Sequence, residues 1–324
     1  MRQLSLIVAL AMLMVGGIVA QSVSAQDGTP APEAPEPTAP GQMTVPLAIG
    51  LFESVPDAPV AFYLSLATFP PGASTPPEPD PGPSMTYVQS GQLRFEIEGP
   101  ATVTRLDVGP QPATGEVTVG AGDWVVVPMG VPFRVLNEGS EYAVALVAGL
   151  LPLETVTGAT PSAEEATPIA SPEGTPSALA SPEGTTPEFI FEPLAGGVIT
   201  ELPPAPLAVA LLRLTYDPGA GDPIPSQNAG PLIGYVENGQ IGYTLASGQA
   251  TTGKAGSLEF TEAPVGQEVI LNPGDWLFEQ AGAASQGRNT DGAGASVLLA
   301  ILAPPDAFLI PQPTTDPAAS PVAG

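Results

Sequence analysis

The sequence predicts an all-β protein that consists of two tandem barrel-type domains. Apolar and polar residues alternate over short runs, Gly and Pro separate these runs, and the order of motifs in the first half recurs in the second half. Short alternating runs bounded by turn residues are typical of antiparallel strands in barrels and sandwiches. Because the two halves share one order of motifs, we interpret the chain as a duplicated β-domain.

The duplication is clearest in residues 122–137 and 274–289. Each stretch reads as a Gly-Asp turn, an apolar strand that opens on Trp, a second turn centred on Gly, and a strand that ends on Asn. Gly122 and Gly274 suit turn positions with positive φ, and the Asp that follows each can accept hydrogen bonds from nearby amides. We therefore expect a repeated hairpin with these framework residues: Gly122, Asp123, Gly130 and Asn137, and Gly274, Asp275, Gly282 and Asn289.

Residues 43–154 form the first predicted domain. Its sharpest alternation is at 92–98, where Leu93, Phe95 and Ile97 oppose Arg94, Glu96 and Glu98, as in a half-buried strand. Further strands are expected at 60–68, 85–89, 102–106, 115–119, 124–128, 133–137 and 142–147. The second domain, residues 187–304, repeats this order from 207–216 onward, and neither half shows a helical pattern.

Composition divides the rest of the chain. Residues 1–25 read as an export signal, with Arg2, an apolar run and the small residues Val23-Ser24-Ala25, which predicts a secreted or extracytoplasmic protein at a bacterial cell surface. The alternative is an uncleaved N-terminal anchor. We expect a disordered spacer at 26–42, a disordered Pro/Ser/Thr/Glu-rich linker at 155–186 and a loose tail at 305–324. No membrane span is expected once the signal is removed.

Charge and missing residue types exclude several functions. The chain has 33 acidic and 7 basic residues, a formal charge of -26, so its field repels phosphate backbones and we expect no nucleic-acid partner. It has no Cys and no His. It therefore lacks thiol chemistry, disulfides, the commonest general base and the commonest transition-metal ligand.

At these motifs the chain resembles the cupin superfamily, and specifically a bicupin with two conserved jelly-roll barrels. The second cupin motif is Gly, five residues, Pro-x-Gly, two residues, His, three residues, Asn. The first half matches it at Gly122, Pro128, Gly130 and Asn137, but Phe133 replaces the His. In the second half Gln280 replaces the Pro and Ser285 replaces the His.

The first cupin motif places two His and one Glu between framework glycines. Glu78, Asp80 and Ser84 occupy these positions in the first half, between Gly72 and Gly91. Counting back from Gly239 in the second half gives Ser226, Asn228 and Leu232. Family enzymes hold Mn or Fe with three His and one Glu, and none of these survives here. The resemblance therefore implies the fold and a pocket at each barrel mouth, but no metal and no cofactor.

We expect pockets lined by Glu78, Asp80, Ser84 and Phe133 in the first barrel and by Ser226, Asn228 and Ser285 in the second. The leading function is metal-free, non-catalytic binding of a small polar molecule or an extracellular protein partner. One alternative is an extracellular structural or adhesive protein with filled barrels. A second is an enzyme that uses Glu78 and Asp80 as acid and base. The resemblance also implies that the two domains pack through their sheets.

Overall fold

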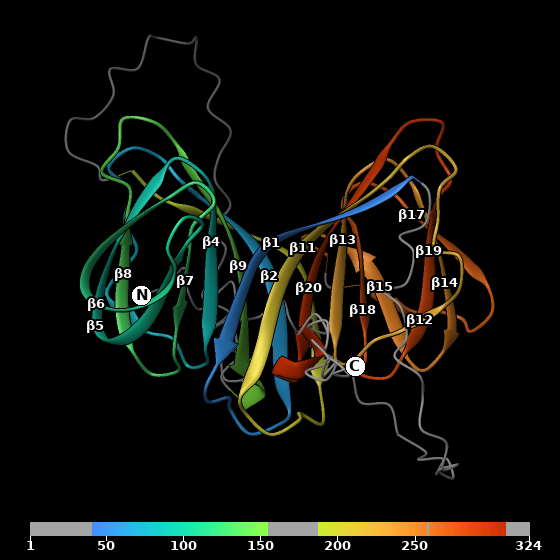
Figure 1. Ribbon diagram of the computed structural model, residues 1–324, viewed down its shortest axis with the longest axis horizontal. Coiled ribbons are helices and arrows are strands. Elements are labelled where there is room, and N and C mark those ends of the chain that lie inside the picture. The colour runs from blue at the N-terminus through green and yellow to red at the C-terminus, as the bar shows by residue number, and fades with distance from the viewer. Residues whose placement is uncertain (1–40, 155–186, 258, 309–324) are drawn as a thin grey trace, which may run out of the picture.

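The computed structural model describes residues 41–154, 187–257 and 259–308, which form two curled antiparallel barrels side by side (Figure 1). The first barrel has the strand order β10 (Ile190–Ile199), β2 (Val60–Phe69), β9 (Ala143–Pro152), β4 (Ser84–Ser90), β7 (Trp124–Val127), β5 (Gln92–Arg105), β8 (Pro132–Leu136) and β3 (Glu78–Pro79), and β6 (Gly109–Gly120) pairs with β5. The expected signal and linker, the spacer up to residue 40 and the tail from residue 309 lie outside the described residues. The spacer prediction ended one residue too late, because Gln42 begins a strand, and the predicted loose tail starts with the 3₁₀ turn Pro305–Phe308.

The second barrel is made of two sheets. One has the order β1 (Gln42–Phe52), β11 (Leu207–Tyr216), β20 (Ala295–Ala303), β13 (Leu232–Asn238), β18 (Asp275–Glu279), β15 (Ala250–Lys254) and β16 (Phe260–Glu262). The other has the order β12 (Ser226–Gln227), β19 (Ala284–Asn289), β14 (Ile241–Ser247) and β17 (Glu268–Leu271). A short 3₁₀ turn, η2 (Pro305–Phe308), follows β20. None of the described helices is long and apolar enough to cross a membrane.

The predicted all-β fold of two tandem jelly-roll barrels is confirmed. The predicted strand 207–216 coincides with β11, and 60–68 lies within β2. The predicted strands 92–98 and 102–106 are one long strand, β5, with a register irregularity between Ile97 and Ala101. Strands β1 and β10 were not predicted.

These two strands are exchanged between the halves of the chain. β1 precedes the first barrel in sequence but pairs with β11 of the second barrel, from Gln42 opposite Tyr216 to Phe52 opposite Leu207. β10 follows the linker but pairs with β2 of the first barrel. Each barrel is therefore completed by a strand from the other half, as the central position of β1 beside β11 shows (Figure 1).

The barrels also share one apolar core, which we call the inter-barrel core. It combines Phe52, Phe62, Met85 and Leu150 with Leu207, Ile233, Phe278 and Leu302. Glycines in the exchanged strands permit this close contact. A Cβ on Gly50 of β1 would lie 2.5 Å from Val126, and a Cβ on Gly197 of β10 would lie 2.2 Å from the ring of Phe278. Larger residues at either position would push the barrels apart.

The framework residues hold the repeated hairpins. Gly122 and Gly274 have φ of 91° and 87°, and Gly130 and Gly282 have φ of 77° and 78°. Asp123 accepts a hydrogen bond from the Gly120 amide at 3.1 Å, and Asp275 accepts one from the Asn272 amide at 2.8 Å.

The framework asparagines tie the end of each hairpin to neighbouring loops. Asn137 donates through Nδ2 to the carbonyls of Phe69 and Glu141. Asn289 donates in the same way to three carbonyls, those of Tyr216, Asp217 and Ala293. Both asparagines are buried, so these bonds satisfy amides that water cannot reach.

Candidate functional site

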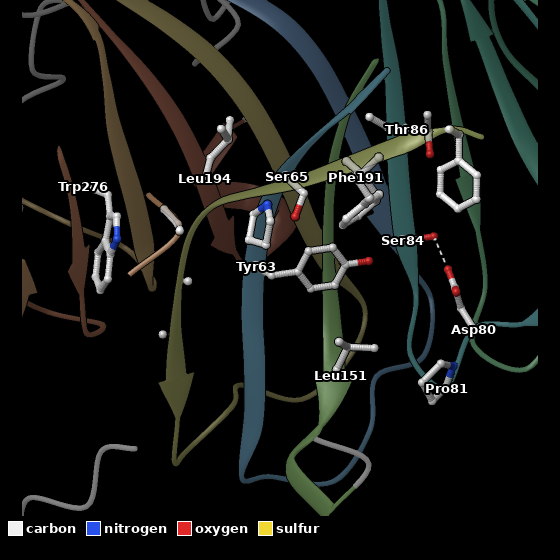
Figure 2. Close-up of a pocket in the computed structure, with 18 of the residues that line it drawn as sticks. Tyr63, Ser65, Asp80, Pro81, Ser84, Thr86, Leu151, Phe191, Leu194 and Trp276 are labelled. Carbon is white, nitrogen blue, oxygen red and sulfur yellow. Dashed lines mark hydrogen bonds between the residues drawn. The ribbon is translucent and has the colours of Figure 1, made fainter. Parts of the chain in front are cut away.

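A cavity of about 210 Å³ lies at the mouth of the first barrel (Figure 2). Strands β2, β4, β8 and β9 provide part of its wall, and the exchanged strand β10 provides another part. Residues of the second barrel, including Thr251 and Trp276, also reach the lining. The cavity is therefore built from both halves of the chain, although most of its polar groups come from the first half.

Asp80 and Ser84 form the polar end of the cavity. The Ser84 hydroxyl donates a hydrogen bond of 2.8 Å to Oδ2 of Asp80. Burial raises the pKa of Asp80 to about 6, against the opposing effect of the Ser84 hydrogen bond. Tyr63 of β2 extends toward this pair (Figure 2), and burial together with the nearby Asp80 raises the pKa of its hydroxyl well above the ordinary value.

Two buried hydroxyl groups line the same cavity. Ser65 of β2 is 2% exposed and Thr86 of β4 is 6% exposed. Within the described part of the chain, neither hydroxyl has a side-chain hydrogen bond, and neither oxygen is among the fully buried polar atoms that lack a partner, so both reach the cavity. Buried hydroxyls normally have partners, so these two are available to a bound molecule.

The remaining wall is apolar. Phe191 and Leu194 of β10 and Leu151 of β9 face the cavity, and Trp276 of β18 lies at the end remote from Asp80 (Figure 2). Phe189, just before β10, also lines it and stacks on Phe69 with a centroid distance of 5.5 Å. Such a lining, with a few convergent polar groups, is typical of a small-molecule site.

The four positions expected in the first-barrel pocket lie together. Glu78, Asp80, Ser84 and Phe133 all line the cavity. Glu78 of β3 is directly opposite Phe133 of β8 in the strand register. The Phe133 ring stacks on Phe95 at 6.4 Å, so it joins the barrel interior to the cavity.

The corresponding positions of the second barrel are arranged differently. Ser226 of β12 is opposite Ser285 of β19, as the resemblance implies, but Ser226 is exposed. Asn228 donates a hydrogen bond to Glu279 of β18, which is 2% exposed. Neither the first-barrel cavity nor the pocket along β15 and β17 includes Ser226, Asn228 or Ser285.

The sequence analysis did not single out Glu279, a buried carboxyl of the second barrel. Burial raises the pKa of its carboxyl, while nearby polar groups, among them Asn228, which donates to it, oppose the shift. Tyr243 lies beside it, and burial and the charge of Glu279 raise the pKa of the tyrosine. The only sequence signal was an acidic residue at the end of an apolar strand, where the first barrel has Val127.

The donor atoms of the first-barrel cavity do not fit a metal centre. Phe133 has no lone pair, and Ser84 already donates to Asp80, so Glu78 and Asp80 are the remaining strong donors. Among the described residues, no group of three His, Cys, Asp or Glu is placed to hold a metal ion.

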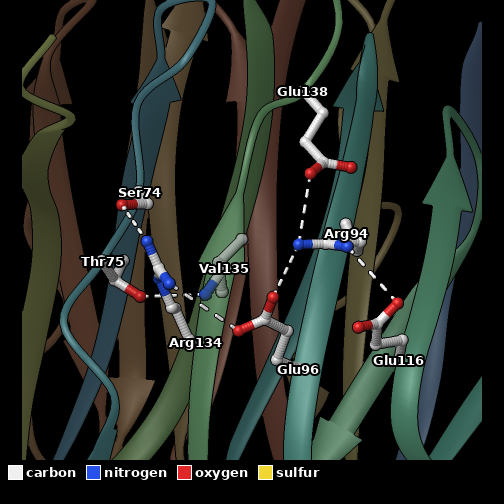
Figure 3. Close-up of polar contacts among 8 residues, drawn as sticks. All are labelled: Ser74, Thr75, Arg94, Glu96, Glu116, Arg134, Val135 and Glu138. Atoms are coloured by element: carbon white, nitrogen blue, oxygen red, sulfur yellow. Dashed lines mark hydrogen bonds and ion pairs between the residues drawn. The ribbon is translucent and has the colours of Figure 1, made fainter. Parts of the chain in front are cut away.

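Arginines on the outer face of the first barrel pair with local carboxylates (Figure 3). Arg94 lies 2.6 Å from Glu96 and 3.2 Å from Glu138, and Arg134 lies 3.8 Å from Glu96. On β5 these side chains alternate with the buried Leu93, Phe95 and Ile97, so they point away from the barrel interior.

The fold and the cavity define a duplicated jelly-roll protein with a small-molecule-sized interior site. Residues 65–149 match the family described as Cupin domain. The first barrel therefore contains a cupin domain, and the second barrel repeats its strand order, which is consistent with a bicupin.

No curated protein matches the chain. Solved structures that resemble the chain include AerE from Microcystis aeruginosa, with 14% identity, 74% of this chain and 87% of that chain covered, and a TM-score of 0.40. The oxalate decarboxylase formate complex of Lactobacillus farciminis has 11% identity, coverage of 75% and 78%, and a TM-score of 0.39. The 7S globulin of Momordica charantia has 12% identity, coverage of 74% and 73%, and a TM-score of 0.38.

Proposed function

We propose that the protein is an exported, non-catalytic bicupin that binds a small molecule in the first-barrel cavity. The observation that carries this proposal is the pair of buried hydroxyls, Ser65 and Thr86, which face the cavity without side-chain partners. Leaving a buried polar group unsatisfied costs about 1–3 kcal/mol, so a ligand that completes these hydrogen bonds gains affinity.

The cavity also has the size and composition of a site for a small ligand. Its volume of about 210 Å³ is below the ~300–1,000 Å³ typical of drug-sized ligands, which favours a smaller molecule. Its apolar walls favour a ligand with an apolar body and one polar end. The N-terminal residues 1–25 support export of the binding protein.

Native mass spectrometry of the exported protein, purified without chelator, tests the proposal. We expect a retained organic adduct on the wild-type protein that is lost from Val147→Phe, because this larger side chain fills the cavity. The matched control is Val144→Phe on the same strand, at a partly buried position outside the cavity lining. An adduct that survives Val147→Phe, or a ligand-free protein that also binds nothing in a small-molecule screen, contradicts the binding function.

A carboxylate-dependent enzyme is the second candidate. It is favoured by Asp80, because a cavity carboxyl with a pKa of about 6 can donate and accept protons near neutral pH. The test is to incubate the protein with any ligand recovered from it and to follow product by mass spectrometry. Turnover that disappears in Asp80→Asn supports catalysis, and an unchanged ligand contradicts it.

A further inference from the structure

The polar end of the first-barrel cavity has carboxyl groups and no opposing cation. Glu78 and Asp80 both line this end. The cationic side chains of the described chain make their contacts elsewhere: Arg94 and Arg134 with Glu96, Arg105 with the Thr118 carbonyl, Arg213 with Glu237, Arg288 with Glu268, and Lys254 with Asp275. A group of opposite charge is therefore missing at Asp80.

Lys254 lines the cavity, but at its other end. It pairs in the strand register with Asp275, directly beside Trp276, and its Nζ lies 3.5 Å from the Asp275 carboxylate. Trp276 and Asp80 lie at opposite ends of the site (Figure 2). The cavity therefore has an acidic end at Asp80 and an aromatic end that has its own ion pair.

We propose that the cavity binds a small organic amine, with its ammonium group at Asp80 and its aromatic or aliphatic body along β10 toward Trp276. This inference rests on the proposed binding function and names its ligand class.

The hydrogen-bonding groups match an ammonium. One carboxylate oxygen of Asp80 accepts from Ser84, which leaves the other oxygen for a ligand. An ammonium has three donors and no acceptor, so it can donate to the free oxygen of Asp80 and to hydroxyl oxygens of the cavity wall, where Thr86 and Ser65 lie on either side of Val147 in the strand register. Charge-assisted hydrogen bonds of this kind are stronger than neutral ones.

The alternatives fit less well. An anionic ligand would place its charge beside Glu78 and Asp80 in a partly buried site, where like charges repel strongly. A polyol would set hydroxyl groups against Phe191, Leu194 and Trp276, which offer no hydrogen bonds from their apolar surfaces. Aromatic rings, in contrast, attract a cation and pack an apolar body.

The test is calorimetric titration of the full chain with three probes of similar shape: 2-phenylethylammonium, 2-phenylethanol and 3-phenylpropionate. We expect the ammonium to bind at least about tenfold more tightly than the alcohol, and the carboxylate to bind most weakly. Asp80→Asn should weaken ammonium binding by about tenfold or more and change alcohol binding by less than about twofold. The matched control is Asp107→Asn, an exposed Asp in the turn between β5 and β6, which should change neither.

Three outcomes overturn the amine class: equal or tighter binding of the alcohol or carboxylate, no effect of Asp80→Asn, or no binding of any probe. If the alcohol binds and Val147→Phe abolishes this binding, the cavity is still a binding site and only the ligand class fails. If no probe binds, the retained-adduct experiment decides the binding function separately.

Discussion

The two barrels share one strand register but treat their interior polar groups in opposite ways. Ser84 pairs with Val127 in the first barrel, and the equivalent pair in the second barrel is Leu232 with Glu279. The interior carboxyl is Asp80, in a loop, in the first barrel and Glu279, at the end of strand β18, in the second barrel. In the second barrel this carboxyl accepts a hydrogen bond from Asn228. In the first barrel it faces a cavity together with the hydroxyls of Ser65 and Thr86.

This difference shows how one fold can place its interior carboxyl either against a partner of the chain or in a cavity. In the second barrel the buried Glu279 carboxyl accepts a hydrogen bond from Asn228, which offsets part of the cost of its burial. The first barrel leaves acceptors in a cavity, which costs stability and creates a site. The predictions below test this contrast, from the largest expected effect to the smallest.

The largest expected effect is the loss of cooperative unfolding when the first barrel lacks the strand that completes it. A fragment of residues 53–199 contains β2 to β10, whereas a fragment of residues 42–154 replaces β10 with β1, which belongs to the other barrel. We expect cooperative thermal unfolding by circular dichroism for 53–199 and none for 42–154, because the latter leaves β2 as an unpaired edge beside an open cavity. Equal melting of both fragments would show that the strand exchange is dispensable.

Asn228→Leu should destabilise the second barrel strongly. It removes a donor to the buried Glu279, so we expect the free energy of unfolding at pH 8 to fall by about 2–3 kcal/mol, measured by urea denaturation. The loss should shrink at acidic pH, where the protonated carboxyl tolerates burial better. Asn238→Leu, at an exposed position of β13, is the control. A similar effect in both variants would mean that Glu279 does not depend on Asn228.

Asp80→Asn should stabilise the protein at high pH. The pKa of Asp80 is about 6 in the folded protein, against 3.8 ordinarily, so the folded state binds the proton more tightly than the unfolded state. This group therefore adds stability at pH values below 3.8 and loses that contribution as pH rises through about 6.

The amide does not ionise, so we expect the variant to be about 1–2 kcal/mol more stable than the wild type at pH 8. The two proteins should converge near pH 4, measured by urea denaturation at both pH values. A variant that is less stable at pH 8 would show that the ionised carboxylate has a stabilising partner in the folded protein.

The smallest effect separates partnered from unpartnered hydroxyls in one barrel. Ser65→Ala should leave the free energy of unfolding unchanged or raise it by up to about 1 kcal/mol, because it removes a buried hydroxyl that makes no side-chain hydrogen bond in the described chain. Ser84→Ala should cost about 0.5–1.5 kcal/mol, because it removes the hydrogen bond to Asp80. Equal costs for the two variants, in thermal or urea unfolding, would contradict the idea that Ser65 is reserved for a ligand.

The sequence predicted the local structure well where the signal is local. Alternation in 60–68 and 207–216 predicted two strands, and the Gly-Asp turns predicted the repeated hairpins. The exchanged strands were missed, because β10 contains Pro193 and two consecutive glycines, which read as a loop. Their partners lie far away in sequence, and no local pattern specifies such pairing.

The candidate site divides in the same way. The resemblance to the cupin motifs implied that Glu78, Asp80, Ser84 and Phe133 share one barrel mouth, and all four line the cavity. Only the tertiary structure decided that β10 and Trp276 close the cavity, and that Glu279 is buried against Asn228. Composition and spacing determined the all-β duplicated fold and its missing metal ligands. The burial of Glu279, the absence of a cation beside Asp80 and the exchange of β1 and β10 depend on contacts between distant segments, which exist only in the folded chain.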